Sequence, residues 1–267
     1  MDETTTRLTV DKQVPGNWRV TLNHPPINTI DDQMYDELLD LLEAIDAEPS
    51  LKVVTFESAN PDFFLAHYGI AESRSRFEKP RWIETSARLA HSNVVSIAVI
   101  RGRARGGGSE FALACDMRFA SREKAIFGQL EIGFGLIPGG GAPQRLPLLV
   151  GRARALEIVL GADDFDAETA EKYGWINRAL PDAELDGFVA NLVRRLLSFD
   201  GQALAINKAI LNQTGLPDQA QLQVAQTVFG ATLRSPDALE RLTKARERGL
   251  GTLGDYELNI GHYAGGL

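Results

Sequence analysis

Glycine is concentrated in one short part of this 267-residue chain, because 10 of its 25 glycines lie within residues 102–141. The first glycine block, residues 102–108, follows the apolar run Val94–Ile100 and precedes a short apolar stretch beginning at Phe111. A buried strand that turns through glycine into a helix leaves backbone N–H groups available at the helix start, and glycine lets a ligand approach them closely. We therefore expect a site for developing negative charge at this turn.

Each of the two glycine blocks also carries a glutamate. Glu110 falls in the first turn of the predicted helix, and Glu131 stands in the apolar, glycine-rich second block, residues 128–141. A carboxylate in such surroundings either has a raised pKa or is held by hydrogen bonds. A structural interpretation remains open for each residue alone: Glu110 as a favourable charge at a helix start, and Glu131 as the buried partner of an arginine.

Several better-known sites are excluded by the pattern of residues. The chain has no GxxxxGK[ST] phosphate loop, and no GxGxxG opens a βαβ unit. Ser109 resembles the serine of a nucleophile elbow, but Phe111 stands where that motif needs glycine. No cluster of His or Cys has metal-ligand spacing, so no metal is predicted.

The order of the elements predicts an α/β first half and a helical second half. Short apolar segments at 18–23, 51–57, 94–100 and 116–121 are typical of strands, and apolar spacing predicts helices over 30–45 and 81–92. Asp31 and Asp32 suit the start of the first helix. Further helices are predicted at 142–149, 152–160, 167–173, 183–199, 201–213, 217–234 and 236–248.

Charge and cysteine content narrow the function classes. The net charge of −8 makes a dedicated nucleic-acid binder an unfavourable interpretation, because phosphate neutralisation needs a basic face. The single cysteine, Cys115, cannot form an internal disulfide, which favours a reducing compartment. The N-terminus lacks the pattern of a signal peptide, and no apolar run approaches the roughly 18 residues of a membrane span. We expect a cytoplasmic protein without nucleic-acid or membrane partners.

Two long segments resemble one family. Residues 106–121, GGGSEFALACDMRFAS, and residues 125–146, AIFGQLEIGFGLIPGGGAPQRL, closely resemble the enoyl-CoA hydratase/isomerase (crotonase) superfamily. The loops at 23–28 and 64–66 and the segment 174–177 resemble it as well, so the likeness extends over most of residues 18–248. It implies a crotonase-like spiral of ββα units in two roughly perpendicular sheets. It also implies a C-terminal helical region that mediates trimerisation.

From this resemblance we expect a spiral core over residues 1–200 and an oligomerisation region over 201–267, assembled as a homotrimer or a dimer of trimers. The implied substrate is an acyl-coenzyme A thioester, with no cofactor other than the coenzyme A that is part of it. Backbone amides of Ala66 and Gly107 would form the oxyanion hole for an enolate. The residues implied to bind substrate are Pro26, Ile27, Leu65, Ala66, His67, Tyr68, Gly106, Gly107, Pro138 and Gly139.

The reaction that the resemblance favours is syn addition of water to a 2-enoyl-CoA. Glu131 would protonate the α-carbon and Glu110 would take a proton from the water, although the two can share these roles. Isomerases of the family usually need only one carboxylate, so the presence of both favours hydration. The alternatives are another acyl-CoA reaction on the same fold (isomerase, decarboxylase, dehalogenase or thioester hydrolase) or a non-catalytic acyl-CoA-binding member.

The sequence departs from the family pattern in its second substrate loop. His67 replaces a usual glycine, and Gly69 replaces a usual aspartate. We interpret His67 as packed against the following helix, with a place in the acyl pocket as the alternative. Tyr68 fits the pocket and an ordinary core or rim position equally well. We expect the acyl pocket itself to come from segments around 67–90 and from the C-terminal helices.

Three alternating arginines and the end of the chain are a second departure. Arg101 and Arg103 are interpreted as a charged edge facing solvent or a subunit. Arg105 stays open between attraction to coenzyme A phosphates, a salt link to an active-site carboxylate and the same charged edge. Residues 249–267 match no part of the family pattern, and we expect them to fold over a neighbouring subunit or to be mobile.

Overall fold

Two β-sheets organise the computed structural model, which describes residues 6–69 and 81–267. The larger sheet contains, in spatial order, β1 (Leu8–Asp11), β2 (Asn17–Leu22), β3 (Val53–Ser58), β5 (Val95–Ile100), β7 (Met117–Ser121) and β10 (Arg178–Leu180). Its strands are parallel except for β1 against β2. The smaller sheet contains β4 (Phe63–Leu65), β6 (Arg103–Arg105), β8 (Ile126–Gly128) and the antiparallel β9 (Phe165–Asp166).

A repeated unit generates both sheets. Each of the pairs β3–β4, β5–β6 and β7–β8 gives its first strand to the larger sheet and its second to the smaller one. The helices that follow the first two pairs are α2 (Arg81–His91) and α3 (Gly107–Ala114), whereas the third pair is followed by the 3-10 turn η1 (Glu131–Phe134) and α4 (Ala142–Val150). The predicted α/β fold of ββα units is therefore confirmed.

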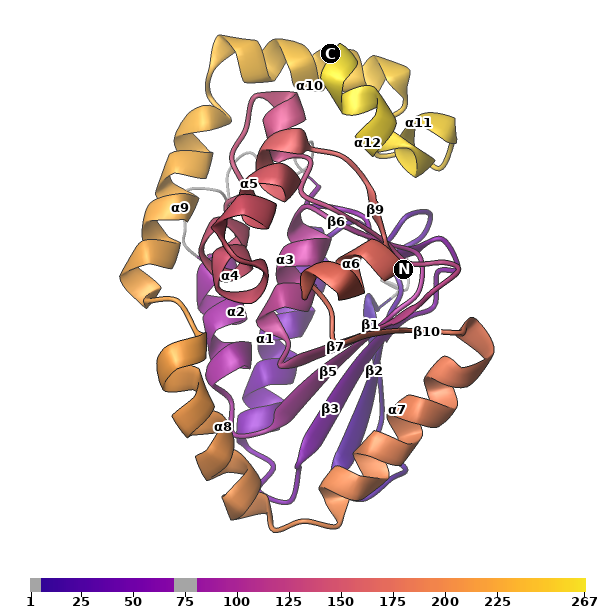
Figure 1. The fold of residues 1–267 in the computed structure, drawn as a ribbon, viewed down its shortest axis with the longest axis vertical. Helices are drawn as coiled ribbons and strands as arrows, with labels where there is room; N and C mark the ends of the chain where they lie inside the picture. The colour runs from indigo at the N-terminus through magenta and orange to yellow at the C-terminus, as the bar shows by residue number, and fades with distance from the viewer. Residues whose placement is uncertain (1–5, 70–80) are drawn as a thin grey trace, which may run out of the picture.

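The larger sheet is covered on both faces, which explains its continuous apolar strands. On one face, α1 (Asp32–Asp46) packs an apolar stripe that includes Met34 and Leu38. On the other face, α7 (Asp182–Leu197) places Leu185 and Val189 against alternate residues of β3 and β5. Figure 1 shows α7 on one side of the strands, with α1 and α2 on the other.

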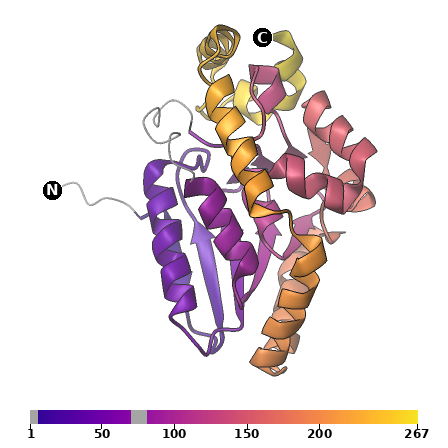
Figure 2. The same ribbon diagram turned by 90° about the vertical axis from the view of Figure 1, so that its left-hand side faces the viewer.

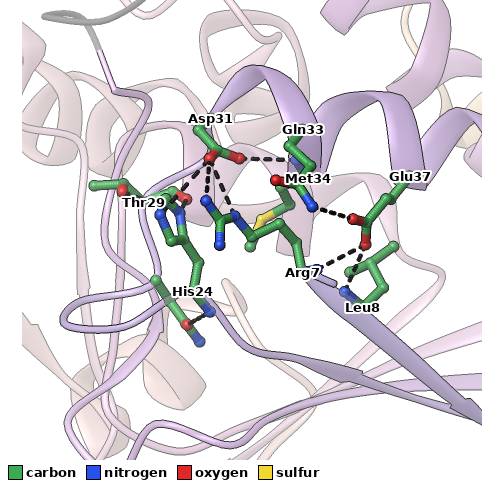
Figure 3. Close-up of polar contacts among 9 residues, drawn as sticks. Arg7, Leu8, His24, Thr29, Asp31, Gln33, Met34 and Glu37 are labelled. Atoms are coloured by element: carbon green, nitrogen blue, oxygen red, sulfur yellow. Dashed lines mark hydrogen bonds and ion pairs between the residues drawn. The ribbon is translucent and has the colours of Figure 1, made fainter. Parts of the chain in front are cut away.

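Polar contacts fix the start of α1 against the first strand, as Figure 3 shows. Asp31 caps the helix by accepting a hydrogen bond from the Met34 amide at 2.8 Å, and it forms an ion pair with Arg7 at 3.0 Å. The Glu37 carboxylate accepts hydrogen bonds from the backbone amides of Arg7 and Leu8, both at 2.8 Å. The predicted helix start at Asp31 is confirmed.

The remaining helical elements of the described residues are α5 (Arg152–Gly161), α6 (Ala167–Tyr173), α8 (Gly201–Gly215), α9 (Gln219–Thr232), α10 (Pro236–Arg248), α11 (Asp255–Leu258), α12 (Ile260–Tyr263) and the 3-10 turn η2 (Ala264–Gly266). Figure 2 shows α8 and α9 following one another along one side of the molecule. Within residues 6–69 and 81–267, no helix combines the length and apolarity that a membrane crossing needs.

Of the two alternatives for residues 249–267, mobility is wrong, because this segment packs on its own chain, while a contact with a neighbouring subunit stays a prediction. Tyr256 and Ile260 are buried in one apolar cluster with Leu130 and Phe134 of the second glycine block. The segment therefore forms part of the wall beside the glycine-rich region. The division of the chain at residue 200 remains a prediction.

Candidate active site

One pocket brings together the two glutamates, both glycine blocks and the C-terminal helices. Seven predicted site residues line it: His67, Tyr68, Gly106, Gly107, Glu110, Glu131 and Gly139. Five predicted residues lie outside its lining: Pro26, Ile27, Leu65, Ala66 and Pro138. Its apolar wall includes Phe134, Leu136, Phe229, Leu242, Leu250 and Ile260. The C-terminal helices thus contribute to the pocket as expected, while residues 70–80 of the predicted acyl region lie outside the described residues.

Glu110 lies in the first turn of α3 and is almost completely buried. Its Oε1 atom accepts hydrogen bonds from the backbone amides of Gly140 at 2.7 Å and Ala142 at 3.1 Å. Burial raises the pKa of Glu110 to about 7, against the opposing effect of these amides and of the Arg145 charge. Glu110 can therefore change its protonation state near neutral pH.

Glu131 is the first residue of the turn η1, in the second glycine block. Burial and the neighbouring charge of Glu110 raise the pKa of Glu131 to about 8, although the Gln129 side-chain amide donates to its carboxylate at 3.2 Å. A Cβ atom on Gly106 would lie only 3.1 Å from Glu131 Oε1, so glycine allows the first block to approach this carboxylate. Among the described residues, no arginine forms an ion pair with Glu131.

The hydrogen bond made by the Ala66 amide argues against the predicted oxyanion role of this residue. Ala66 is fully buried, and its amide donates a hydrogen bond to the Asn28 carbonyl at 3.1 Å. The structure therefore does not support Ala66 as an oxyanion donor. Tyr68 lies in the pocket instead, and its amide nitrogen would be 3.4 Å from a Cβ atom on Gly107.

Strand-like pairing with Ile30 explains why the Tyr68 amide faces α3. The Gly69 amide donates to the Ile30 carbonyl at 3.0 Å, and Ile30 and Tyr68 form a parallel bridge. Successive amides of an extended chain point to opposite edges, so the Tyr68 amide is directed toward α3. Gly107 is the first residue of α3, and its N–H therefore has no acceptor within the helix.

Two of the three alternating arginines, Arg103 and Arg105, bind the C-terminal segment through hydrogen bonds to its backbone. Arg105 is 1% exposed; it forms an ion pair with Asp164, and its Nη1 donates to the Glu257 carbonyl at 2.7 Å. Arg103 Nε donates to the Leu258 carbonyl at 2.7 Å, so it is not a simple charged edge. Arg101 pairs with Asp182 and Asp186 on α7, as a charged edge would. Arg105 is thus not an exposed charged edge, and its carboxylate partner Asp164 lies outside the pocket lining, while attraction to coenzyme A phosphates stays a prediction.

His67 connects the substrate loop with α11. Its Nε2 lies 3.2 Å from Oε1 of the fully buried Glu257, and its Nδ1 lies 3.0 Å from the Tyr68 carbonyl oxygen. His67 thus lines the pocket, as the alternative interpretation expected, while packing against the segment that follows stays a prediction because residues 70–80 lie outside the described residues. Burial lowers the pKa of His67, but the Glu257 charge and the contacts with Glu257 and the Tyr68 carbonyl oxygen together outweigh burial, so the net pKa is raised. Burial raises the pKa of Glu257, but the charges of His67 and Arg105 and the hydrogen bond from the Gly251 amide together outweigh burial, so the net pKa is lowered.

These shifts predict a pH window for the stability of the pair. The raised pKa of His67 stabilises the fold at pH values below its usual 6.5, and this contribution is lost as pH rises through the folded-state pKa. The lowered pKa of Glu257 stabilises the fold above its usual 4.5, and this contribution is lost on acidification. Glu257→Gln is expected to lower the unfolding free energy by about 1–3 kcal/mol near pH 6 and by less near pH 8.

Denaturant titration at the two pH values measures this difference. Glu247→Gln, at an exposed glutamate on α10, is the matched control and should change the unfolding free energy little at either pH. An equal loss at both pH values for Glu257→Gln would contradict the ionised pair.

The described residues contain no group of three or more His, Cys, Asp or Glu side chains placed to hold a metal ion. Sequence reasoning missed Glu257, Asp164 and Arg145 as parts of this region. Glu257 and Asp164 contact residues distant in the chain and stand in no motif, whereas Arg145 stands in the second family-like segment but was given no role there.

The sequence and the fold are both similar to those of known proteins. Residues 16–249 match the family model described as enoyl-CoA hydratase/isomerase. The crotonyl-CoA hydratase of Syntrophomonas wolfei subsp. wolfei is 29% identical over 85% of this chain and 90% of its own. The crystal structure of a provisionally named enoyl-CoA hydratase from Streptomyces avermitilis has a TM-score of 0.94 and 40% identity, covering 100% of this chain and 99% of that one. For an enoyl-CoA hydratase from Mycobacterium avium subsp. paratuberculosis, the TM-score is 0.80 and the identity 29%, covering 90% and 98% of the two chains.

Proposed function

Because the chain belongs to the enoyl-CoA hydratase/isomerase family, we propose that it adds water to the double bond of a 2-enoyl-CoA thioester. The observation that carries this proposal is that two carboxylates with raised pKa values line the same pocket as the first amide of α3. Hydration needs one group to accept a proton from water and another to donate one to carbon. Relatives named as hydratases support the same reaction.

In the proposed reaction, the thioester oxygen accepts hydrogen bonds from the Gly107 and Tyr68 amides. Water attacks the β-carbon, the electrons of the double bond move toward the thioester, and an enolate forms. Preorganised donors at such an oxyanion contribute roughly 3–4 kcal/mol each to transition-state stabilisation. The helix N-terminus at Gly107 adds a favourable partial positive charge.

Burial raises the pKa of both carboxylates, to about 8 for Glu131 and about 7 for Glu110, so each can carry a proton near neutral pH. We assign to Glu131 the protonated form that donates to the α-carbon, and to Glu110 the ionised form that accepts the proton of the attacking water. The cycle leaves Glu110 protonated and Glu131 ionised, so a proton must return to Glu131 before the next turnover. No cofactor enters this scheme, because coenzyme A is part of the substrate.

The proposed substrate contacts are those of His67, Tyr68, Gly106 and Gly139, which line the pocket. We also propose that the protein assembles as a homotrimer or a dimer of trimers. Support comes from large apolar side chains exposed on α8 and α9: Ile206, Ile210, Leu211, Val224 and Val228.

Incubation with 2-enoyl-CoA thioesters of several chain lengths tests the function. The expected result is loss of the ultraviolet absorbance of the conjugated thioester and a product heavier by one water in mass spectrometry. The double variant Glu110→Gln/Glu131→Gln is the matched control and should leave the substrate unchanged. A product of unchanged mass would indicate an isomerase, release of the free thiol would indicate a thioester hydrolase, and binding without turnover would indicate a non-catalytic member.

A further inference from the structure

The indole N–H of Trp82 is a buried donor that the proposed mechanism leaves unused. Trp82 stands in the first turn of α2, is 7% exposed and packs among the rings of Tyr35, Tyr68 and Phe111. Its Nε1 atom is buried and forms no hydrogen bond within the described part of the chain. Buried polar groups of native proteins are nearly always paired, so this donor calls for a functional explanation.

Trp82 Nε1 lies beside Glu110, the proposed acceptor of the proton from water. A Cβ atom on Gly140 would lie 2.3 Å from Trp82 Nε1 and also 2.3 Å from Glu110 Oε2, so both atoms pack closely against Gly140. The other carboxylate oxygen, Oε1, is occupied by the amides of Gly140 and Ala142. Glu110 Oε2 and Trp82 Nε1 therefore lie against the same glycine, and both side chains line the active-site pocket.

We propose that the Trp82 N–H holds the oxygen atom that is added to the β-carbon, first as the attacking water and then as the 3-hydroxyl of the product. This inference rests on the proposed hydration. The water gives one proton to Glu110, attacks the β-carbon with one lone pair and accepts the indole N–H with the other. In the reverse direction the same hydrogen bond stabilises the departing oxygen. Trp82 itself neither gains nor loses a proton, because the indole is a donor only.

Trp82→Phe separates this role from packing, because phenylalanine keeps an aromatic ring and removes the N–H. We expect the kcat for hydration to fall about 10-fold, as for the loss of one hydrogen bond in a transition state, with KM changed by less than about twofold. A second assay follows exchange of the α-protons of a saturated acyl-CoA in heavy water. That exchange uses the oxyanion site and a carboxylate but involves no oxygen at the β-carbon, so its rate should be unchanged.

Trp175→Phe is the matched control, since Trp175 is a buried tryptophan that packs against Phe127 and Phe165, outside the pocket lining. Its hydration kcat should stay within about twofold of the unmodified protein. Parallel loss of hydration and exchange in Trp82→Phe would overturn the proposal in favour of simple packing. Unchanged hydration would also overturn it. Absence of hydration by the unmodified protein would reject the proposed function itself, and this inference with it.

Discussion

Glu131→Gln is expected to lower the hydration rate at least about 100-fold while making the folded protein more stable near pH 8. The loss of rate follows because glutamine cannot donate the proton that the α-carbon must receive, and general acid catalysis is typically worth 10²–10⁴-fold. The gain in stability follows because the variant keeps a neutral group of similar shape beside Glu110, whose charge helps to raise the pKa of Glu131.

The sign of the pH dependence follows from linkage. The pKa of Glu131 rises from 4.5 to about 8 in the folded protein, so the folded state binds a proton that the unfolded state releases between these values. The free energy of unfolding therefore falls as pH rises through this range. The stability gain of Glu131→Gln should be small near pH 5 and on the order of 2–4 kcal/mol near pH 8.

Thermal unfolding of both proteins across this pH range provides the measurement. The exposed Glu171 of α6 supplies a control, since Glu171→Gln should leave both the rate and the pH slope of stability unchanged. A variant that retained its rate would remove Glu131 from the mechanism, and an unaltered pH slope would contradict its raised pKa.

The longer elements were predictable because their residues repeat a pattern over several turns. The helices predicted at 167–173 and 236–248 match α6 and α10 at both ends, and Asp31 marked the start of α1. The strands of the smaller sheet were not predicted, because each has only two or three residues and cannot display an alternation. Their conformation is fixed by pairing with one another, which depends on the whole fold.

The candidate site likewise has some residues that local motifs predict and some contacts that depend on the whole fold. Glu110, Glu131 and Gly107 stand in local motifs, so the sequence was sufficient to place them together. The pairing of the Ala66 amide and the direction of the Tyr68 amide were not predictable, because both depend on contacts with residues 28–30. The contacts of His67 and Arg105 with α11 join residues about 150 or more positions apart, and no spacing rule signals them.

Gly108→Ala is expected to cost both activity and stability, because this glycine is where α3 touches the smaller sheet. A Cβ atom there would lie 2.1 Å from the Leu65 carbonyl oxygen and 2.7 Å from the Leu65 Cβ atom. Backbone cannot give way as a flexible side chain does, so α3 and β4 must separate. This separation moves Gly107, the first residue of α3, away from Tyr68, which comes after β4 in the chain.

The expected loss in hydration is at least about 100-fold, the effect of removing one oxyanion donor. Overpacking should also lower the unfolding free energy by about 1–3 kcal/mol, measured by denaturant titration. Gly187→Ala on α7 is the matched control, because nothing lies within 4 Å of the added Cβ atom. That variant should keep full activity and gain up to about 1 kcal/mol from helix propensity. Full activity in Gly108→Ala would mean that the contact between α3 and β4 does not hold the two amides in place.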